Sequence, residues 1–434
     1  MEMMLPGVTE AMLEPDFWIR RLRQSDEAHH MDRATCSDIL WSDCRDLVHV
    51  PSIAATFLTN LDLDVFHRWL TLPEIDGRTL YNEHSQPLNE TFWQTVTTNA
   101  SFGKEQMYVR FGFAVRRADV RRWPTATCAF RTPEDREFDQ FQETALHTFE
   151  PVIVLADSRD GQWHYAISQT YAGWVRSADI AIATWQDFLQ YAQPERFVVV
   201  TRPGVCTQAN PYDEAVSKRW IEMAAYLPIA DAAEPSVGNQ IRVGHTPILY
   251  PVRLPDGTLE VRTALISNRA GIHEGYLPFS PAWAIRSAFQ LLTERYGWGD
   301  SFGNHDCSSL VMDVFRTMGV PLPRNAGAQE HASRHRVEIP PSAGVRERMR
   351  LLEGLGPGVP LYMPGHTMLY LGCVDHRHYV IHDFAGFLDD ERGDEIFVPV
   401  NEVMVSTLDV KSSKGQTYLE SLTGVLELFP SAVR

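Results

Sequence analysis

Apolar residues recur at helical spacing through much of the first hundred residues. The pattern is clearest in DFWIRRLRQ (16–24), SIAATFLTNLDLDVFHRWL (52–70) and ETFWQTVTTN (90–99). Apolar side chains three or four residues apart lie on one face of a helix, and packing against the rest of the protein buries that face. These stretches carry no chemical motif, so we predict that residues 1–106 form a helical region with a packing or stabilising role.

From about residue 107 the pattern changes to short stretches in which apolar and polar residues alternate, as in strands. A strand, an Asp-Gly turn and a second strand occur in PVIVLADSRDGQWHYAISQ (151–169) and again in PILYPVRLPDGTLEVRTALIS (247–267). Glycine readily adopts the positive φ that such hairpin turns require. We therefore predict two small β-barrel modules, at 107–185 and 186–280, with a helical insert at YDEAVSKRWIEMAAYL (212–227).

The last part of the chain, 281–434, has helical patterns followed by strand patterns. WAIRSAFQLLTERY (283–296) and CSSLVMDVFRTMG (307–319) predict helices, and apolar runs at 360–366, 367–374, 378–384 and 395–400 predict strands. Helices followed by a meander of strands indicate an α+β domain. The whole chain is thus predicted to be a multidomain α+β protein.

Composition narrows the function classes. The formal net charge of −17 disfavours a nucleic-acid binder, and Arg116, Arg117, Arg121 and Arg122 are interpreted as a solvated face. No apolar run is long enough to span a membrane, and the N-terminus lacks a secretory signal. Either the protein is cytoplasmic, or an export signal was removed and it acts in the periplasm or cell envelope. We expect a monomer without a cofactor.

One of the six cysteines, Cys307, has a distinctive context. It follows Asp306 at the predicted start of a helix, in NHDCSSLVMDVF. A helix N-terminus favours a thiolate, which is the reactive form, and its N–H groups can stabilise an oxyanion. The six cysteines contain no CxxC pair, which disfavours a structural zinc site.

Two histidines complete a catalytic pattern. His366 follows a Pro-Gly turn at the start of a strand, and His382 lies sixteen residues on (382 − 366), on the next predicted strand. Nucleophilic cysteine chemistry needs a base and a third polar group that orients the base. Cys307, His366 and His382 in this order therefore predict a cysteine nucleophile, its base and the orienting residue.

A metal site is the alternative use of the same region. His376 and His378 lie near His366 and His382, and Asp375 and Asp383 add oxygen atoms. The two histidines of HRH would lie on opposite sides of a turn, and the chain has no HExxH-type helix. We therefore predict no metal.

The motifs around Cys307 resemble those of the NlpC-type cell-wall peptidases, a papain-like family. Tyr296 to Asp300 matches the family's Tyr-x-Trp-Gly-Gly except at the last position, and Asp306 to Ser309 matches Asp-Cys-Ser-Gly except at the last position. Leu322, Pro323 and Arg324 match a following Leu-Pro-Arg element. His366 and His382 correspond to the family's base and third residue.

The resemblance implies a fold and an activity. The chain is similar to the branch of the family with an N-terminal stabilising region and two SH3-like modules. This similarity implies a γ-D-glutamyl-L-diamino acid endopeptidase that acts on murein peptides with a free N-terminal L-alanine. It implies that Tyr296 helps to hold the oxyanion. It also implies that Asp306, Ser308, Tyr171 and Glu150 bind substrate, the glutamate and tyrosine from the first SH3-like module.

Departures from the family leave alternatives open. Ala326 stands where relatives often carry a serine, and Asp300 and Ser309 replace glycines, so the exact substrate is not fixed by the resemblance. The same three residues could serve an amidase or acyltransferase on another γ-linked or lipid amide. A protein of another class, a non-catalytic binder of cell-wall peptide, would show no fast labelling of Cys307.

Overall fold

The structure is a computed structural model, and it consists of two compact units. It describes residues 5–22, 47, 49–59, 73–75, 77–101, 107–231, 235–333, 335–389 and 396–429. Unit 1 holds the described parts of Met1–Asp46, Tyr276–Tyr296 and Asn304–Arg434. Unit 2 holds the described parts of Leu47–Gly275, together with Gly297–Gly303. No helix within the described ranges is long and apolar enough to cross a membrane.

Unit 1 is built on a six-stranded antiparallel sheet in the order β17-β22-β18-β19-β20-β21. The strands are β17 (Arg336–Glu338), β22 (Gly424–Leu426), β18 (Pro360–Met363), β19 (His366–Val374), β20 (Arg377–Asp389) and β21 (Ile396–Thr407). The helix α8 (Cys307–Thr317) is buried along its whole length and packs against β19, β20 and α7 (Pro281–Phe289). The predicted strands of this region are therefore present, in one sheet that carries the helix of Cys307.

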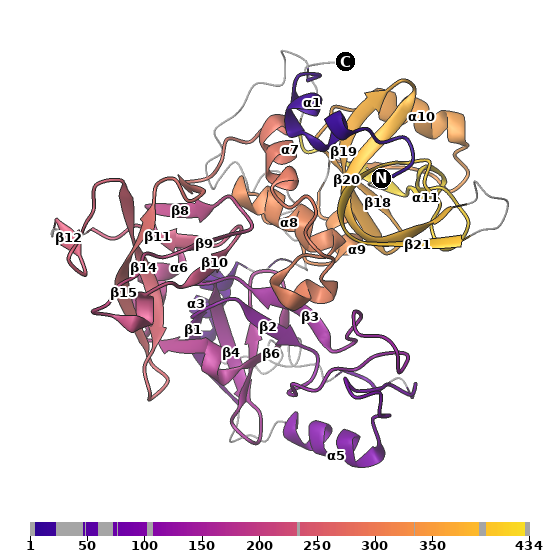
Figure 1. The fold of residues 1–434 in the computed structure, drawn as a ribbon. Coiled ribbons are helices and arrows are strands. Elements are labelled where there is room, and N and C mark those ends of the chain that lie inside the picture. Colours follow the sequence, from indigo (N-terminus) through magenta and orange to yellow (C-terminus); the bar gives the residue numbers. More distant parts are fainter. Residues whose placement is uncertain are drawn as a thin grey trace. The chain divides into compact units, whose positions relative to one another are not determined.

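The N-terminal segment belongs to the same unit. The helix α1 (Pro15–Ile19) packs on α7 (Figure 1). The Trp18 ring is fully buried, with its centroid 5.3 Å from that of Tyr379 on β20. The Tyr379 hydroxyl donates to the carbonyl of Gly7 at 2.8 Å. This segment thus has a packing role in unit 1.

The first β module of unit 2 is a seven-stranded sheet in the order β3-β2-β6-β5-β4-β1-β7. Its strands are β1 (Met107–Ala114), β2 (Ala118–Arg121), β3 (Gln142–Leu146), β4 (Pro151–Asp157), β5 (Trp163–Ile167), β6 (Ala172–Arg176) and β7 (Ile180–Ala183). The predicted hairpin joins β4 to β5, and Gly161 in its turn has φ +69°. The helices α3 (Val50–Thr59) and α6 (Trp185–Ala192) pack against this sheet.

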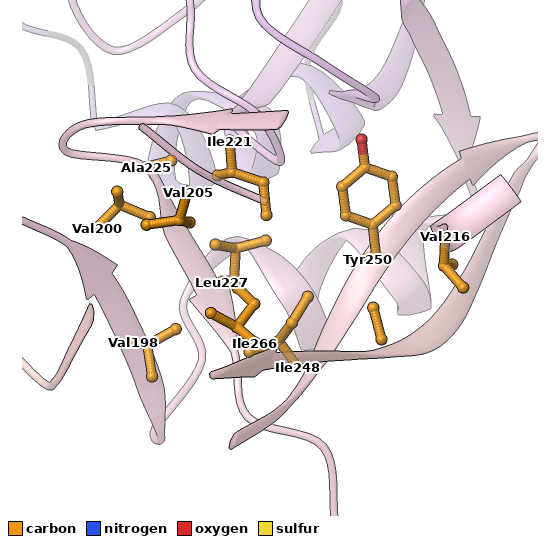
Figure 2. Close-up of a cluster of buried hydrophobic side chains, with 11 residues drawn as sticks. Val198, Val200, Val205, Val216, Ile221, Ala225, Leu227, Ile248, Tyr250 and Ile266 are labelled. Atoms are coloured by element: carbon orange, nitrogen blue, oxygen red, sulfur yellow. The ribbon is translucent and has the colours of Figure 1, made fainter. Parts of the chain in front are cut away.

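The second β module has smaller sheets around a core of its own. The predicted hairpin pairs β14 (His245–Arg253) with β15 (Leu259–Ser267), and Gly257 in its turn has φ +91°. The other strands are β8 (Phe197–Val200), β9 (Gly204–Cys206), β10 (Trp220–Glu222), β11 (Tyr226–Pro228), β12 (Ser236–Val237), β13 (Gln240–Ile241) and β16 (Ile272–Glu274). Figure 2 shows the buried valine, isoleucine and leucine side chains that meet between these strands.

The predicted helix at 212–227 is wrong. This stretch forms a short 3-10 turn (Glu214–Val216) followed by β10 and β11. Lys218 and Ala224 have φ of +53° and +64°, which a right-handed helix does not allow. Val216, Ile221 and Leu227 instead enter the core of the second module (Figure 2). Tertiary burial thus outweighs a helical spacing that is also compatible with short strands.

Of the other predicted helices, one is present over its full length and one over part of it. The helix α5 (Glu90–Asn99) matches its prediction, and its N-cap Asn89 accepts a hydrogen bond from the Phe92 N–H. The helix predicted at 283–296 ends at Phe289, and Thr293 has φ +68°. Residues 60–70, the second part of the helix predicted at 52–70, lie outside the described residues. The short helices α9 (Ala326–Glu330), α10 (Val345–Glu353) and α11 (Tyr418–Ser421) complete unit 1.

Candidate active site

Cys307 is the first residue of α8, at the N-terminus that the sequence predicts. Asp306 is its N-cap, and the carboxylate accepts the N–H groups of Ser308 and Ser309, both at 3.0 Å. The Ser309 hydroxyl accepts the Asp306 N–H at 2.9 Å in return, which completes a capping box. Ser309 therefore does not disturb a loop where the family has glycine, because it helps to fix the helix start.

A buried arginine neutralises Asp306. Arg324 donates from two nitrogens to the two carboxylate oxygens of Asp306, at 3.1 and 2.7 Å. Its Nη1 also donates to the Ser308 hydroxyl at 2.8 Å, and that hydroxyl donates to Asp306 at 2.9 Å. Burial alone would raise the pKa of Asp306, but the charge and hydrogen bonds of Arg324 lower it to about 2. The pair explains why the sequence carries an arginine at this distance from the nucleophile.

The Cys307 thiol is buried but not sealed, with 8% of the residue exposed. The backbone N–H of Thr367, the residue after His366, hydrogen-bonds to it, which places the sulfur beside the start of β19. Burial and the negative charge of Asp306 raise the pKa of the thiol to about 12. At neutral pH the resting nucleophile is therefore a thiol, although a helix N-terminus alone would favour the thiolate.

The structure brings His366 and His382, the predicted base and its orienting residue, within hydrogen-bonding distance. The two rings lie on neighbouring strands, and His366 Nε2 is 2.8 Å from His382 Nδ1. The second nitrogen of His382, Nε2, is 2.8 Å from the Ser406 hydroxyl on β21. Burial lowers the pKa of His366 to about 4, although the Asp306 charge opposes this, and lowers that of His382 well below its usual value. Both imidazoles are therefore neutral at pH 7, and a neutral imidazole can accept a proton.

Ser406 and Tyr418 are members of the site that sequence reasoning missed. Ser406 is fully buried and extends the hydrogen-bonded relay by one residue. The ring centroid of Tyr418 on α11 lies 5.7 Å from that of His366 and 5.6 Å from that of His382. A lone serine on a strand and a tyrosine near the C-terminus carry no motif, so no sequence signal marked either of them.

Tyr296 is half-buried, in a segment hydrogen-bonded to β21, where its N–H donates to the Asn401 carbonyl at 2.9 Å. Burial and the nearby Cys307 and Asp306 raise the pKa of its hydroxyl well above the usual value. The hydroxyl therefore keeps its proton and can donate a hydrogen bond beside the nucleophile.

The segment after Tyr296 binds to the first β module within unit 2. Asp300 has φ +66° and is buried, and its carboxylate accepts from the Thr144 hydroxyl at 2.8 Å and the Ala145 N–H at 3.2 Å. A Cβ on Gly299 would lie 2.6 Å from the Gln142 carbonyl oxygen, so only glycine fits there. Asp300 thus takes a backbone conformation that favours glycine and adds two hydrogen bonds, which accounts for the departure from the motif.

Glu150 and Tyr171, the predicted substrate residues of the first β module, have different partners. Glu150 is 4% exposed, and its carboxylate accepts the His147 N–H at 3.0 Å and lies 3.0 Å from His147 Nδ1. The Tyr171 hydroxyl donates to Glu143 at 2.5 Å. Glu143 is the extra residue of a β-bulge between β3 and β2, because Val120 pairs with Thr144 and Arg121 with Gln142. A bulge redirects a side chain, and this feature cannot be read from alternation alone.

No group of three or more His, Cys, Asp or Glu within the described ranges is arranged to hold a metal ion.

Ala326 is the first residue of α9, behind the N-cap Asn325. A methyl group at this position offers no polar contact.

A cysteine at a helix start, beside a strand whose first histidine is hydrogen-bonded to a second one, defines a cysteine-hydrolase type of site. Comparison with known families agrees. Residues 293–378 match the sequence model of the NlpC/P60 family, and residues 128–176 match the SH3 domain of the SH3b1 type. The chain therefore contains an NlpC/P60 domain, of the family that includes cysteine peptidases, and an SH3 domain of the SH3b1 type.

A solved structure shares the fold over most of this chain. An NlpC/P60 endopeptidase from Photobacterium damselae subsp. piscicida is 20% identical, with a TM-score of 0.72 over 95% of this chain and 96% of that one. An NlpC/P60 family protein from Bacillus cereus ATCC 10987 is 19% identical, with a TM-score of 0.46 over 67% of this chain and 83% of that one. None of the curated proteins matches the chain.

Proposed function

We propose that this protein is a cysteine endopeptidase that hydrolyses the γ-D-glutamyl-L-diamino acid bond of peptidoglycan-derived peptides with a free N-terminal L-alanine. The relay from His366 to His382, 2.8 Å between the two ring nitrogens, carries the proposal. It leaves His366 Nδ1 as the nitrogen that can serve Cys307. The motifs of the NlpC/P60 family and the cell-wall substrates of that family support the choice of peptide.

The protonation of the relay follows from its hydrogen bonds. For Nδ1 of His366 to act as a base, its Nε2 must carry the proton and donate to His382 Nδ1. His382 then holds its own proton on Nε2 and donates to the Ser406 hydroxyl. His382 thus fixes the tautomer and orientation of the base without exchanging a proton with substrate.

The reaction proceeds through a thioester. His366 takes the proton of Cys307 as the sulfur attacks the γ-glutamyl carbonyl, and the carbonyl oxygen becomes an oxyanion. The Cys307 N–H, which the Asp306 cap does not use, and the Tyr296 hydroxyl stabilise this oxyanion. The C–N bond breaks as His366 protonates the leaving amine, and water, deprotonated by His366, then releases the acid and restores the thiol.

Hydrolysis of L-Ala-γ-D-Glu-diaminopimelate tests the proposal. Wild-type protein is expected to release L-Ala-D-Glu, and Cys307→Ala is expected to abolish the reaction while the circular dichroism spectrum and Tm stay unchanged. Cys206→Ala, at an exposed cysteine of the second β module, is the matched control and should keep full activity. Full activity of Cys307→Ala, or no activity of the wild type on this peptide, would overturn the proposal.

We further propose that acidic groups bind the substrate's ammonium. Asp306 and Ser308 remain predicted substrate residues on unit 1, and Tyr171 on unit 2. Glu143 is a stronger candidate than Glu150 for Tyr171's acidic partner, because its side chain is about a quarter exposed (23%), whereas that of Glu150 is 3% exposed. A desolvated ammonium needs a carboxylate partner, and Glu143 is the carboxylate that the Tyr171 hydroxyl contacts.

Acetylation of the peptide's N-terminal amine is expected to lower kcat/KM by about two orders of magnitude or more, because the carboxylates lose their charged partner. Glu143→Gln should lower kcat/KM for the free amine and reduce this preference, whereas Glu150→Gln should keep it. Equal rates on the free and acetylated peptides would refute amine recognition. A preference lost in Glu150→Gln and kept in Glu143→Gln would return the role to Glu150.

We also propose that residues 186–280 form a second SH3-like module, and that boundaries at 106/107, 185/186 and 280/281 separate the functional parts. The repeated strand, Asp-Gly turn and strand of β4–β5 and β14–β15 supports this division. The separate hydrophobic core around Ile248 and Ile266 gives the second module its own packing.

A further inference from the structure

His305, two residues before the nucleophile, is a buried histidine for which the proposed mechanism has no use. Its ring is held between two carboxylates of unit 1. Nδ1 lies 2.6 Å from Glu294, and Nε2 lies 3.1 Å from Asp313. The backbone N–H of His305 also donates to Glu294 at 2.8 Å. Only 2% of the residue is exposed.

The contacts determine the charge of the ring. An ionised carboxylate only accepts hydrogen bonds, so a ring with a carboxylate at each nitrogen must donate from both and carry a positive charge. Burial alone would lower the pKa of His305, but Glu294 and Asp313 raise it to about 10. The other acidic group that influences this ring is Asp383 on β20. Burial raises the pKa of Asp383 to about 9, so that carboxyl is neutral at pH 7.

The two partners of His305 come from the two elements that carry the nucleophile and the oxyanion donor. Asp313 lies on α8, six residues after Cys307 (313 − 307). Glu294 lies two residues before Tyr296, in a segment fixed to β21 by the bond from the Val403 N–H to the Glu294 carbonyl at 2.8 Å. The ring therefore connects α8 to the Tyr296 segment through two charge-assisted hydrogen bonds in a buried place.

We propose that His305 is a positioning residue whose charged ring holds the Tyr296 hydroxyl in place relative to Cys307. The inference rests on the proposed function for its kinetic consequence, because the Tyr296 hydroxyl is one of the two oxyanion donors. A loss of the ring would let the Tyr296 segment and α8 shift relative to one another. A displacement of well below 1 Å already weakens a preorganised donor.

The kinetic test is a double-mutant cycle of His305→Gln and Tyr296→Phe on the peptide above. His305→Gln is expected to lower kcat by about 10- to 100-fold with KM within about twofold, because the loss affects the transition state. In the Tyr296→Phe background the same substitution should cost less than about threefold, since the donor that it positions is gone. His378→Gln, at another buried histidine of unit 1, which bonds to Tyr370, is the matched control and should keep kcat.

A purely structural role predicts other results. It would lower Tm in both His305→Gln and His378→Gln without a change in kcat at 25 °C, and it would give independent effects in the cycle. Either outcome overturns the proposal. Alkylation of Cys307 by iodoacetamide needs no oxyanion donor, so its rate should change less than about threefold in His305→Gln. A larger loss would mean that the substitution disturbs the nucleophile itself, and this too would overturn the proposal.

Two readouts are independent of substrate, and the first of them needs no variant. In ¹⁵N-labelled wild-type protein at pH 8, both ring nitrogens of His305 should carry protons, and a neutral ring would overturn the proposal. The ring signals of Tyr296 should move in Asp313→Asn, which keeps the side-chain shape and removes the charge, and unmoved signals would also overturn it. If both signatures are present and the wild type cleaves no peptide, the proposed function has failed and the positioning contact has not.

Discussion

At the residue scale, desolvation and one neighbouring charge determine the pKa of the nucleophilic thiol. The helix N-terminus favours a thiolate, but burial and Asp306 raise the pKa of Cys307 to about 12, and His366, at about 4, is neutral. The resting pair is thus a thiol and an imidazole. Proton transfer must then accompany the attack on the carbonyl, rather than precede it as an ion pair.

This state has a measurable pH dependence. The rate of Cys307 alkylation by iodoacetamide is expected to rise from pH 6 to pH 9 without a plateau, because the thiolate fraction grows about tenfold per pH unit below the pKa. Asp306→Asn removes the adjacent negative charge and leaves Arg324 unneutralised, so it should accelerate alkylation at pH 7 by about tenfold for each unit by which the pKa falls. Asp409→Asn, at a carboxylate 59% exposed, is the control and should change nothing. A plateau below pH 7 in the wild type would contradict this account.

The sequence predicted Cys307, His366 and His382 as catalytic candidates because each stands at the start of an element or in a motif, and the structure brings the two histidines together. It did not identify Ser406, since only the pairing of β20 with β21 brings this serine to His382. It proposed Glu150 rather than Glu143, because the bulge that places Glu143 beside Tyr171 has no signature in the apolar pattern. Contacts made across strands are decided by register, which a single sequence specifies only weakly.

At the element scale, strands and turns were predicted better than helices. The two Asp-Gly hairpins were predicted correctly, because their glycines require positive φ and their flanking residues alternate cleanly. The helix predicted at 212–227 failed because positive φ at Lys218 and Ala224 divides the segment into short strands. Helical spacing over sixteen residues (227 − 212 + 1) did not decide the conformation of this segment. The core of the second module buries the same side chains when the segment forms short strands.

At the scale of the whole molecule, the multidomain α+β organisation was predictable from the change in pattern along the chain. Which segments of the chain make up unit 1 was not predictable in this way. Trp18 lies far from Tyr379 in sequence, yet the two rings pack together, and the segment 297–303 lies in unit 2 while its neighbours at both ends lie in unit 1. Such exchanges depend on a few buried contacts, and apolar periodicity does not show which partner an apolar face will find.

Two buried groups of unit 1 predict how the stability of the protein depends on pH. The folded state keeps a proton on Asp383 up to about pH 9, whereas an unfolded aspartate releases it near pH 4. It also keeps a proton on His305 up to about pH 10, whereas an unfolded histidine releases it near 6.5. Both groups bind more protons when folded, so the free energy of unfolding must fall as the pH rises from 6.5 to 9.

Asp383→Asn isolates one of these contributions. The carboxamide has nearly the shape of the protonated acid and no proton to lose, so the slope of unfolding free energy against pH should be shallower by up to about 1.4 kcal/mol per pH unit. Urea titrations of the full chain at pH 6.5, 8 and 9 measure this slope, and the variant should gain on the wild type as the pH rises. Asp409→Asn, at an exposed carboxylate, should keep the wild-type slope. If Asp383→Asn also keeps it, the Asp383 carboxyl is ionised in the folded protein, and the neutral acid beside the active site is refuted.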